Sequence, residues 1–150
     1  MRWLVALGVL GLVSCGVPEG ALRIKQYHLR AVGDDPAGVA PLRAERRKRL
    51  HGAISEAEQR ERLGHYYAVR WDGPPGRERE AVRLVFDYRQ AATGDEVRRL
   101  EIERPGTGEG VAEFRVTGPA YLRGGRVLAW RLRFFRGGEL VETHRSYLWE

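Results

Sequence analysis

The segment Val82–Tyr88, which reads Val-Arg-Leu-Val-Phe-Asp-Tyr, decides the fold class of this chain. Large apolar side chains stand at every second position, and arginine, valine and aspartate occupy the positions between them. This period of two is typical of a β-strand, because successive side chains of a strand point to opposite faces of a sheet. One face of this strand is therefore expected to pack in a core, and the other to face water.

The same alternation recurs on both sides of this segment. It is present in the stretches 22–30, 65–71, 99–103, 112–117 and 128–134. Clusters rich in glycine and proline separate these stretches, and the pairs Gly124-Gly125 and Gly137-Gly138 have the spacing of two-residue hairpins. About six or seven short strands with such turns predict a mainly β fold, an antiparallel β-sandwich, with a small closed β-barrel as the alternative.

Residues 65–150 resemble the sandwiches of the immunoglobulin and fibronectin type III domains in the number and spacing of their strands. Trp71 and Trp130 lie on apolar faces of their strands and are expected to fill the centre of the sandwich. The disulfide of antibody domains is missing, because Cys15 is the single cysteine. The resemblance is architectural and implies no ligand.

A helical segment is expected at about residues 42–63, before the main sheet region. Within it, Ser55–Glu58 has the form of a capping box, which predicts a short helix from Glu56 to Leu63. Gly64 follows where a C′ glycine would end that helix. After the first strand, Pro36 and Pro41 are expected to keep the following stretch of chain loop-like.

The first fourteen residues have the three parts of a secretory signal peptide. Arg2 gives a positive start, Trp3–Val13 is apolar, and small residues follow. The apolar run is shorter than the roughly 20 residues that a membrane-spanning helix needs. We therefore exclude residues 1–14 from the fold and expect one domain over residues 21–150.

Leu12-Val13-Ser14-Cys15 resembles the lipobox of bacterial lipoproteins. In that family the peptide is cut just before the cysteine, whose sulfur carries a diacylglycerol and whose new amino group is usually acylated as well. The resemblance implies that Cys15 is lipidated, that residues 15–20 form a tether, and that the chain is anchored in the cell envelope. Gly16 resembles the pattern for sorting to the outer membrane, facing periplasm or exterior, if the host has two membranes. An ordinary secretory signal with an incidental cysteine is the alternative.

The net charge is +6, from 26 basic and 20 acidic residues that are largely interspersed. We interpret most of this charge as a solvated surface and expect no nucleic-acid partner for a secreted protein. The exception is a basic run that forms either a helix or an extended charged arm, and that either faces solvent or contacts anionic headgroups. Its cations are Arg43, Arg46, Arg47, Lys48 and Arg49.

No catalytic motif is present in the sequence. The four histidines (His28, His51, His65 and His144) have no metal-ligand spacing. The glycine-rich stretch Gly106–Gly110 precedes a strand rather than a helix, so it is interpreted as a hairpin turn and not as a phosphate-binding loop. We therefore expect no catalytic residue, no metal and no cofactor.

Most aromatic side chains are expected in the core, and two are candidates for exposure. Phe135 lies on the arginine-bearing face of its strand, and Trp149 follows the last strand pattern. Exposed aromatic side chains would suit a protein-partner or glycan surface. The alternative is that a second sheet or the helix covers them.

Together these features predict a lipid-anchored protein of the cell envelope, whose domain is a non-catalytic binding or scaffolding module. Its expected partners are the membrane, through the covalent lipid, and an envelope protein. A small envelope hydrolase or transferase, with a site assembled from distant residues, is one alternative. The other is an accessory subunit of a secretion or surface-assembly machine, in which a sheet edge pairs with a partner strand.

Overall fold

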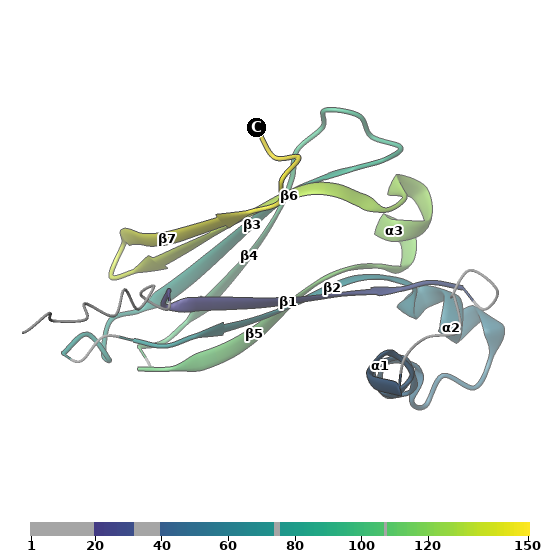
Figure 1. Cartoon of the computed structure of the whole chain (residues 1–150), viewed down its shortest axis with the longest axis horizontal. Helices are drawn as coiled ribbons and strands as arrows, with labels where there is room; N and C mark the ends of the chain where they lie inside the picture. The colour runs from purple at the N-terminus through teal and green to yellow at the C-terminus, as the bar shows by residue number, and fades with distance from the viewer. Residues whose placement is uncertain (1–19, 32–39, 74–75, 107) are drawn as a thin grey trace, which may run out of the picture.

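The computed structural model describes residues 20–31, 40–73, 76–106 and 108–150, which form seven strands and three helices (Figure 1). Cys15 and the rest of the lipobox therefore lie outside the described residues. The strands are β1 (Leu22–Leu29), β2 (Gly64–Trp71), β3 (Val82–Gln90), β4 (Arg98–Arg104), β5 (Gly110–Thr117), β6 (Val127–Arg136) and β7 (Glu139–Arg145). The helices are α1 (Ala40–Leu50), α2 (Glu56–Arg62) and α3 (Gly118–Gly124).

The strands form two antiparallel sheets, in the orders β1-β2-β5 and β4-β3-β6-β7, which lie face to face (Figure 1). The prediction of a mainly β sandwich is confirmed. The alternative of a closed barrel is wrong, because the two sheets of the described residues stay separate. If the strands are lettered A to G, the sheets are ABE and DCFG, whereas constant immunoglobulin domains have ABED and CFG. The fourth strand, β4, thus lies at the edge of the other sheet.

The core consists of the inward faces of both sheets, as the alternation predicts. Phe86 of β3 is at its centre, and the centroid of its ring lies 4.5 Å from that of Tyr67 and 5.1 Å from that of Phe114. Trp71 and Trp130 both belong to this cluster, so their predicted place is confirmed. Aromatic pairs at such separations add to the free energy gained from burial.

Only one of the two Gly-Gly pairs forms a hairpin. Gly137 and Gly138, with φ of 57° and 87°, join β6 to its neighbour β7, as predicted. Gly124 instead ends α3, a helix that the sequence analysis did not predict, and Gly125 follows with φ of 74°. The hairpin prediction fails there because β5 and β6 belong to different sheets, so the chain has to cross between layers.

The predicted hairpin at Gly106–Gly110 is wrong for the same reason. This stretch joins β4 to β5, which also belong to different sheets.

The crossing through α3 is held by Gln90 at the end of β3, whose buried amide donates to the carbonyl oxygens of Ala120 (3.0 Å) and Gly125 (2.8 Å). The helix α3 therefore closes one end of the sandwich.

The capping box of α2 is confirmed. Ser55 Oγ accepts from the Glu58 amide at 3.2 Å, and Glu58 Oε2 accepts from the Ser55 amide at 2.9 Å. Gly64 follows the C-cap residue Leu63 and so occupies the predicted C′ position, and it is also the first residue of β2. Gly64 has φ of 141°, and a Cβ there would lie 2.1 Å from the carbonyl oxygen of Val116, so this glycine allows β5 to approach.

The basic run forms α1, which settles the choice between a helix and an extended arm. Pro41 lies in the first turn, where a missing amide hydrogen costs nothing, so the loop-like prediction is wrong there. No residue of α1 is buried, and Arg49 attaches it to the sheet β1-β2-β5. The Arg49 side chain pairs with Glu113 at 2.5 Å and lies over the Tyr66 ring at 4.1 Å. Within the described residues, no helix has both the length and the apolar character needed to cross a membrane.

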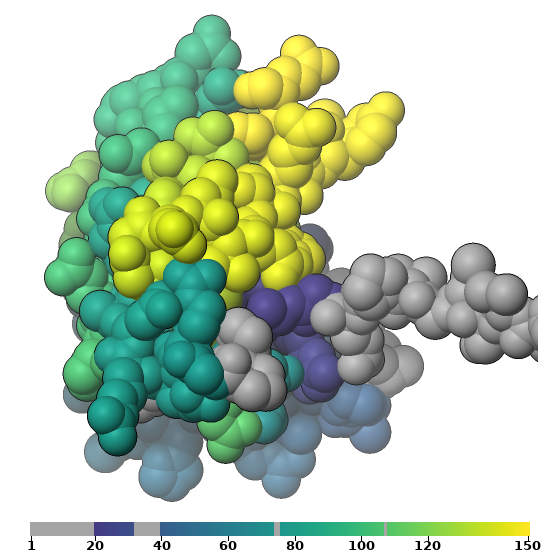
Figure 2. Space-filling model, turned by 90° about the vertical axis from the view of Figure 1, so that its left-hand side faces the viewer, coloured from purple at the N-terminus to yellow at the C-terminus, as the bar shows by residue number. Residues whose placement is uncertain are grey.

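The start of β1 and the helices α1 and α2 lie at opposite ends of the molecule (Figure 1). Figure 2 views the end at which β1 begins: β1 lies beside the yellow β6–β7 region, and the blue helices appear only at the lower margin. A Cβ on Gly20 would meet the Glu142 carboxylate of β7, which places the start of the described chain at this edge. The basic helix is thus close to residue 20 in sequence but far from it in space.

Candidate anion-binding face

The outer face of the sheet β4-β3-β6-β7 carries a cluster of arginines that the sequence analysis did not recognise. Strand register places Asp87 of β3 directly between Arg99 of β4 and Arg131 of β6. Alternation adds further side chains to the same face, and the C-terminal segment adds one more. We call this surface the arginine face and define it as Arg83, Asp87, Arg89, Arg99, Arg131, Arg133, Phe135 and Trp149.

A single carboxylate organises the centre of this face. Asp87 accepts from Arg99 Nε at 2.6 Å, from Arg131 Nη2 at 2.8 Å and from Arg133 Nη2 at 3.1 Å. The Asp87 side chain is fully buried under these arginines, although its strand position predicted a wet face. Burial alone would raise the pKa of Asp87, but the hydrogen bonds from Arg99 and Arg131 and the charge of Arg133 leave that pKa lowered.

Aromatic rings fix the outer arginines. The Trp149 ring lies between the guanidinium groups of Arg89 and Arg131, with its centroid 4.9 Å and 5.0 Å from their Cζ atoms. The Phe135 ring has Arg83 Cζ at 4.4 Å and Arg133 Cζ at 5.8 Å. Such cation–π contacts contribute about 0.5–1 kcal/mol each where they are partly exposed. These ring contacts therefore add to the hydrogen bonds with Asp87 in fixing the arginine side chains.

Trp149 is buried, with 6% of its surface exposed, so the alternative in which it is covered holds, although arginines lie over its ring instead of a second sheet or the helix. Ser146 extends the pairing of β7 with β6, because its amide donates to the Trp130 carbonyl oxygen (2.9 Å) and its Oγ accepts from the Trp130 amide (3.0 Å). The chain then turns, and the Trp149 amide donates to the Ser146 carbonyl oxygen (3.1 Å). Phe135 is half-buried between its two arginines. Partner binding through Phe135 and Trp149 stays a prediction.

The face has an excess of positive charge. Three guanidinium groups surround one carboxylate, so two positive charges at the centre are not compensated by Asp87. The side chains of Arg99, Arg131 and Arg133 remain 52%, 34% and 25% exposed, although Nε of Arg131 and of Arg133 is buried. Acidic side chains on this face stand on β4, where Glu101 lies 3.8 Å from Arg83. The excess of positive charge therefore lies nearer to β6 than to β4.

Fixed guanidinium groups of this kind suit the binding of an anion. The guanidinium is planar, is always charged and presents several donors in a rigid fork that matches carboxylate or phosphate oxygens. Little side-chain entropy remains to be lost on binding, because Asp87 and the rings already hold the arginines in place. The arginine face offers charge and hydrogen-bond donors to a ligand.

A second cluster of polar side chains lies where β1 and β2 meet α3. The rings of His28 and His65 stack at 3.9 Å, and His28 Nδ1 accepts from Arg30 Nε at 3.2 Å. The remaining nitrogen, His28 Nε2, therefore donates to Tyr121 Oη at 2.8 Å. Burial, followed by the charges of His28 and Arg30, lowers the pKa of His65 to about 3. His65 is thus neutral near pH 7 and is not suited to acid–base catalysis there.

The α1 cations that were predicted to contact anionic headgroups have different environments in the structure. Arg49 is taken up by its ion pairs with Glu45 and Glu113, and Arg46 Nη1 donates to the carbonyl oxygen of Arg30 at 3.1 Å. Arg43, Arg47 and Lys48 are exposed on α1. Contact of this helix with anionic headgroups stays a prediction.

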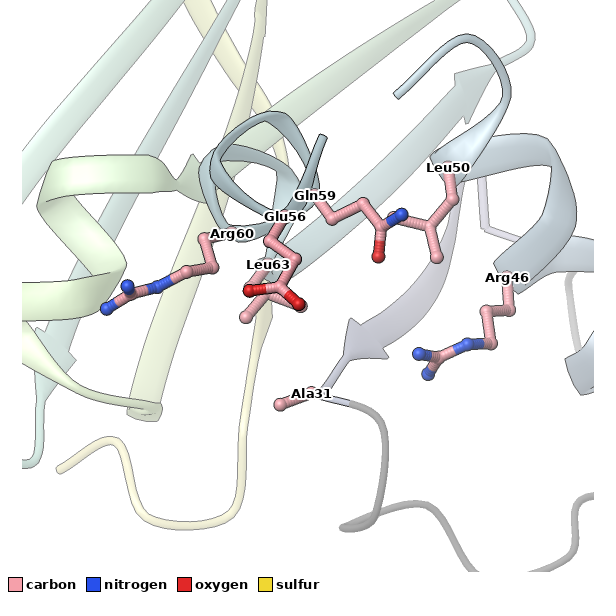
Figure 3. A pocket seen from close by; sticks show the side chains of 7 residues that line it. All are labelled: Ala31, Arg46, Leu50, Glu56, Gln59, Arg60 and Leu63. Atoms are coloured by element: carbon pink, nitrogen blue, oxygen red, sulfur yellow. The ribbon is translucent and has the colours of Figure 1, made fainter. Parts of the chain in front are cut away.

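Figure 3 shows a pocket between α1, α2 and the chain that leaves β1. In this view Gln59 of α2 extends toward Leu50 of α1, so the pocket mixes polar and apolar side chains. Among the described residues, no group of three or more His, Cys, Asp and Glu side chains could hold a metal ion. The lining residues are Ala31, Arg46, Leu50, Glu56, Gln59, Arg60 and Leu63.

The sequence analysis identified Phe135 and the arginine-bearing face of its strand but missed Asp87. The alternation of β3 contained one usable signal, an aspartate on the same face as arginines. The partners of Asp87 on β4 and β6, however, depend on strand pairing.

Comparison of the chain with models of known families, with curated proteins and with solved structures finds no match.

Proposed function

We propose that this chain is a lipid-anchored protein of the bacterial cell envelope, and that its β-sandwich is a non-catalytic module that binds an anionic partner. The observation that carries the binding role is the set of three guanidinium groups fixed around Asp87. These groups have more positive charge than the carboxylate neutralises, and they are partly exposed on a broad sheet face.

The lipobox resemblance supports the anchor. Cys15 precedes the start of β1 at Leu22 by seven residues, which span at most about 24 Å when fully extended. A lipid on Cys15 would hold the β1 end of the sandwich toward the membrane and leave α1 and α2 pointing away from it. The arginine face, on the side of the sandwich, would then be open to a partner in the aqueous space.

Metabolic labelling tests the anchor. Cells that express the wild-type chain or Cys15→Ala are grown with a fatty-acid probe, and we expect label in the wild type only. Mass spectrometry of the native product should give an acylated cysteine at its first position. An unlabelled wild type, or a product with a free thiol at its start, would show that the chain is not lipid-anchored.

The alternative of a hydrolase or transferase is less well supported, since the histidine with a strongly shifted pKa, His65, stays neutral over the range in which such enzymes work. The accessory-subunit alternative has one observation in its favour. Strand β7 is an edge of its sheet, and Leu140 and Val141 on it are 55% and 38% exposed. A partner strand could pair there by adding to the sheet.

Hydrogen exchange tests this second candidate. If a partner strand adds to β7, the outward amides of β7 exchange more slowly in envelope preparations than in the purified chain, because they donate to the partner. Amides of β4, the other edge of the same sheet, provide the comparison. Equal exchange of β7 in both preparations would remove the strand-addition alternative.

A further inference from the structure

We infer that the arginine face binds an extended acidic segment of a protein partner, which lies along β6 with alternate Asp or Glu side chains on Arg131 and Arg133. This inference rests on the proposed binding function and does not depend on the lipid anchor. Three properties of the face carry it: the chemistry of the group already bound there, the spacing of the arginines, and the position of the acidic side chains.

The first property is that the cluster already binds a carboxylate. The side chain of Asp87 accepts hydrogen bonds from three guanidinium groups at 2.6–3.1 Å. The guanidinium groups of Arg131 and Arg133 are planar and favour contacts with carboxylates, and because Nε of both is buried, a further carboxylate has to contact their Nη donors. Two further carboxylates, together with Asp87, would balance the charges of Arg99, Arg131 and Arg133.

The second property is spacing. Arg131 and Arg133 stand two positions apart on β6, so their Cα atoms are about 6.8 Å apart. Alternate side chains of any extended peptide repeat with the same period. A segment parallel or antiparallel to β6 can therefore present one acidic side chain to each arginine. Arg145 of β7 pairs with Arg131 in the register and adds a cation on the side away from β4.

The third property is the acidic edge of the face. Glu101 and Glu103 of β4 share the face, in register with Val85 and Arg83 of β3. A broad anionic surface, such as a bilayer or a nucleic-acid duplex, would cover β4 as well and bring its charges close to both glutamates. A single extended chain over β6 avoids them. The face is therefore suited to a narrow anionic ligand.

Fluorescence anisotropy with labelled peptides tests the inference. One peptide carries Glu at every second position, and a control carries the same number of Glu at every third position, with Thr elsewhere and equal length. Consecutive Glu side chains of the control point to opposite faces when the peptide is extended. The full chain is held in a zwitterionic detergent. An oligothymidylate of the same charge is the third probe.

We expect the alternating peptide to bind roughly tenfold more tightly than the control peptide. The double variant Arg131→Gln/Arg133→Gln should weaken that binding by roughly tenfold or more, because two charge-assisted contacts are lost. The matched variant Arg47→Gln/Lys48→Gln removes the same charge from α1 and should change the affinity less than about twofold, as expected for cations remote from the ligand. Thermal unfolding of each variant identifies the temperature range in which it is folded, and the affinities are compared within that range.

Two results would overturn the inference. Equal binding of both peptides would remove the spacing argument, and tighter binding of oligothymidylate would replace the acidic segment by a phosphate chain. In either case a loss of affinity in the Arg131/Arg133 variant would keep the proposed anion-binding role of the face. If no probe binds in a way that depends on these two arginines, that role is wrong as well.

Discussion

Replacing Asp87 by Asn tests whether one carboxylate organises the arginine face. Asn has nearly the same shape and keeps one oxygen acceptor, so the change removes a charge with little change in packing. Asp87 is fully buried and accepts three charge-assisted hydrogen bonds. The variant leaves three neighbouring guanidinium groups without the charge of Asp87.

The size of the effect follows from the exposure of the partners. Removing one partner of a fully buried ion pair costs about 3–5 kcal/mol. The three arginines here are between 25% and 52% exposed, so water can solvate them again after the change and reduces this cost. We expect the Asn variant to lose about 2–3 kcal/mol of unfolding free energy. The melting temperature should fall by roughly 8–12 °C.

Urea unfolding across a range of pH is the assay. The pKa of Asp87 is lowered from 3.8 in the folded chain, so its contribution to stability is complete above that value and is lost as the pH falls through the folded pKa. The difference between wild type and variant should therefore be constant from about pH 5 to pH 8 and shrink below about pH 4.

The control is Asp72→Asn. Asp72 is 45% exposed, and its nearest contacts with Arg23 and Arg70 are 3.8 Å and 3.9 Å, so this variant should unfold almost as the wild type does. If Asp87→Asn is as stable as the control variant, or if the difference persists unchanged below about pH 3, the carboxylate does not hold the arginines as described.

Three further predictions concern other parts of the fold. Because the pKa of His65 is lowered from 6.5 to about 3, stability should fall as the pH drops below 6.5, by as much as about 2 kcal/mol at pH 5, and His65→Gln should lose this slope in urea titrations. Gly64→Ala should lose about 3 kcal/mol or more, because its Cβ meets backbone, whereas Gly52→Ala, with open space around it, should lose about 1–2 kcal/mol; equal losses would contradict the close approach. Arg49→Gln should speed hydrogen exchange in α1, while Arg47→Gln should leave it unchanged; slow exchange in both would show that α1 is held otherwise.

Local patterns in the sequence predicted the elements of this fold well. The alternation of Val82–Tyr88 gives the strand β3 and its core face, since side-chain direction in a strand depends only on position. Ser55 and Glu58 predict the start of α2, because both partners of the capping box lie within one turn. Gly137 and Gly138 predict the β6–β7 turn in the same way.

Features that depend on distant partners were missed or wrong. Gly124 and Gly125 have the composition of a hairpin, but the chain crosses between sheets there, and α3 forms instead. Trp149 follows the last strand pattern, where exposure was one of the two alternatives. The turn at Ser146 instead places its ring against Arg89 and Arg131, and it is buried. Both outcomes depend on which strands become neighbours, which no short pattern specifies.

The sequence by itself determined that this chain forms antiparallel strands in which apolar and polar side chains alternate, and it placed a lipobox-like segment before them. Only the tertiary structure decided that Asp87 meets Arg99, Arg131 and Arg133, because strand order and register bring those residues together from three strands. Period-two patterns fix the face of a side chain through local geometry. Pairing between strands is set by the packing of the whole sandwich, and the candidate site depends on that pairing.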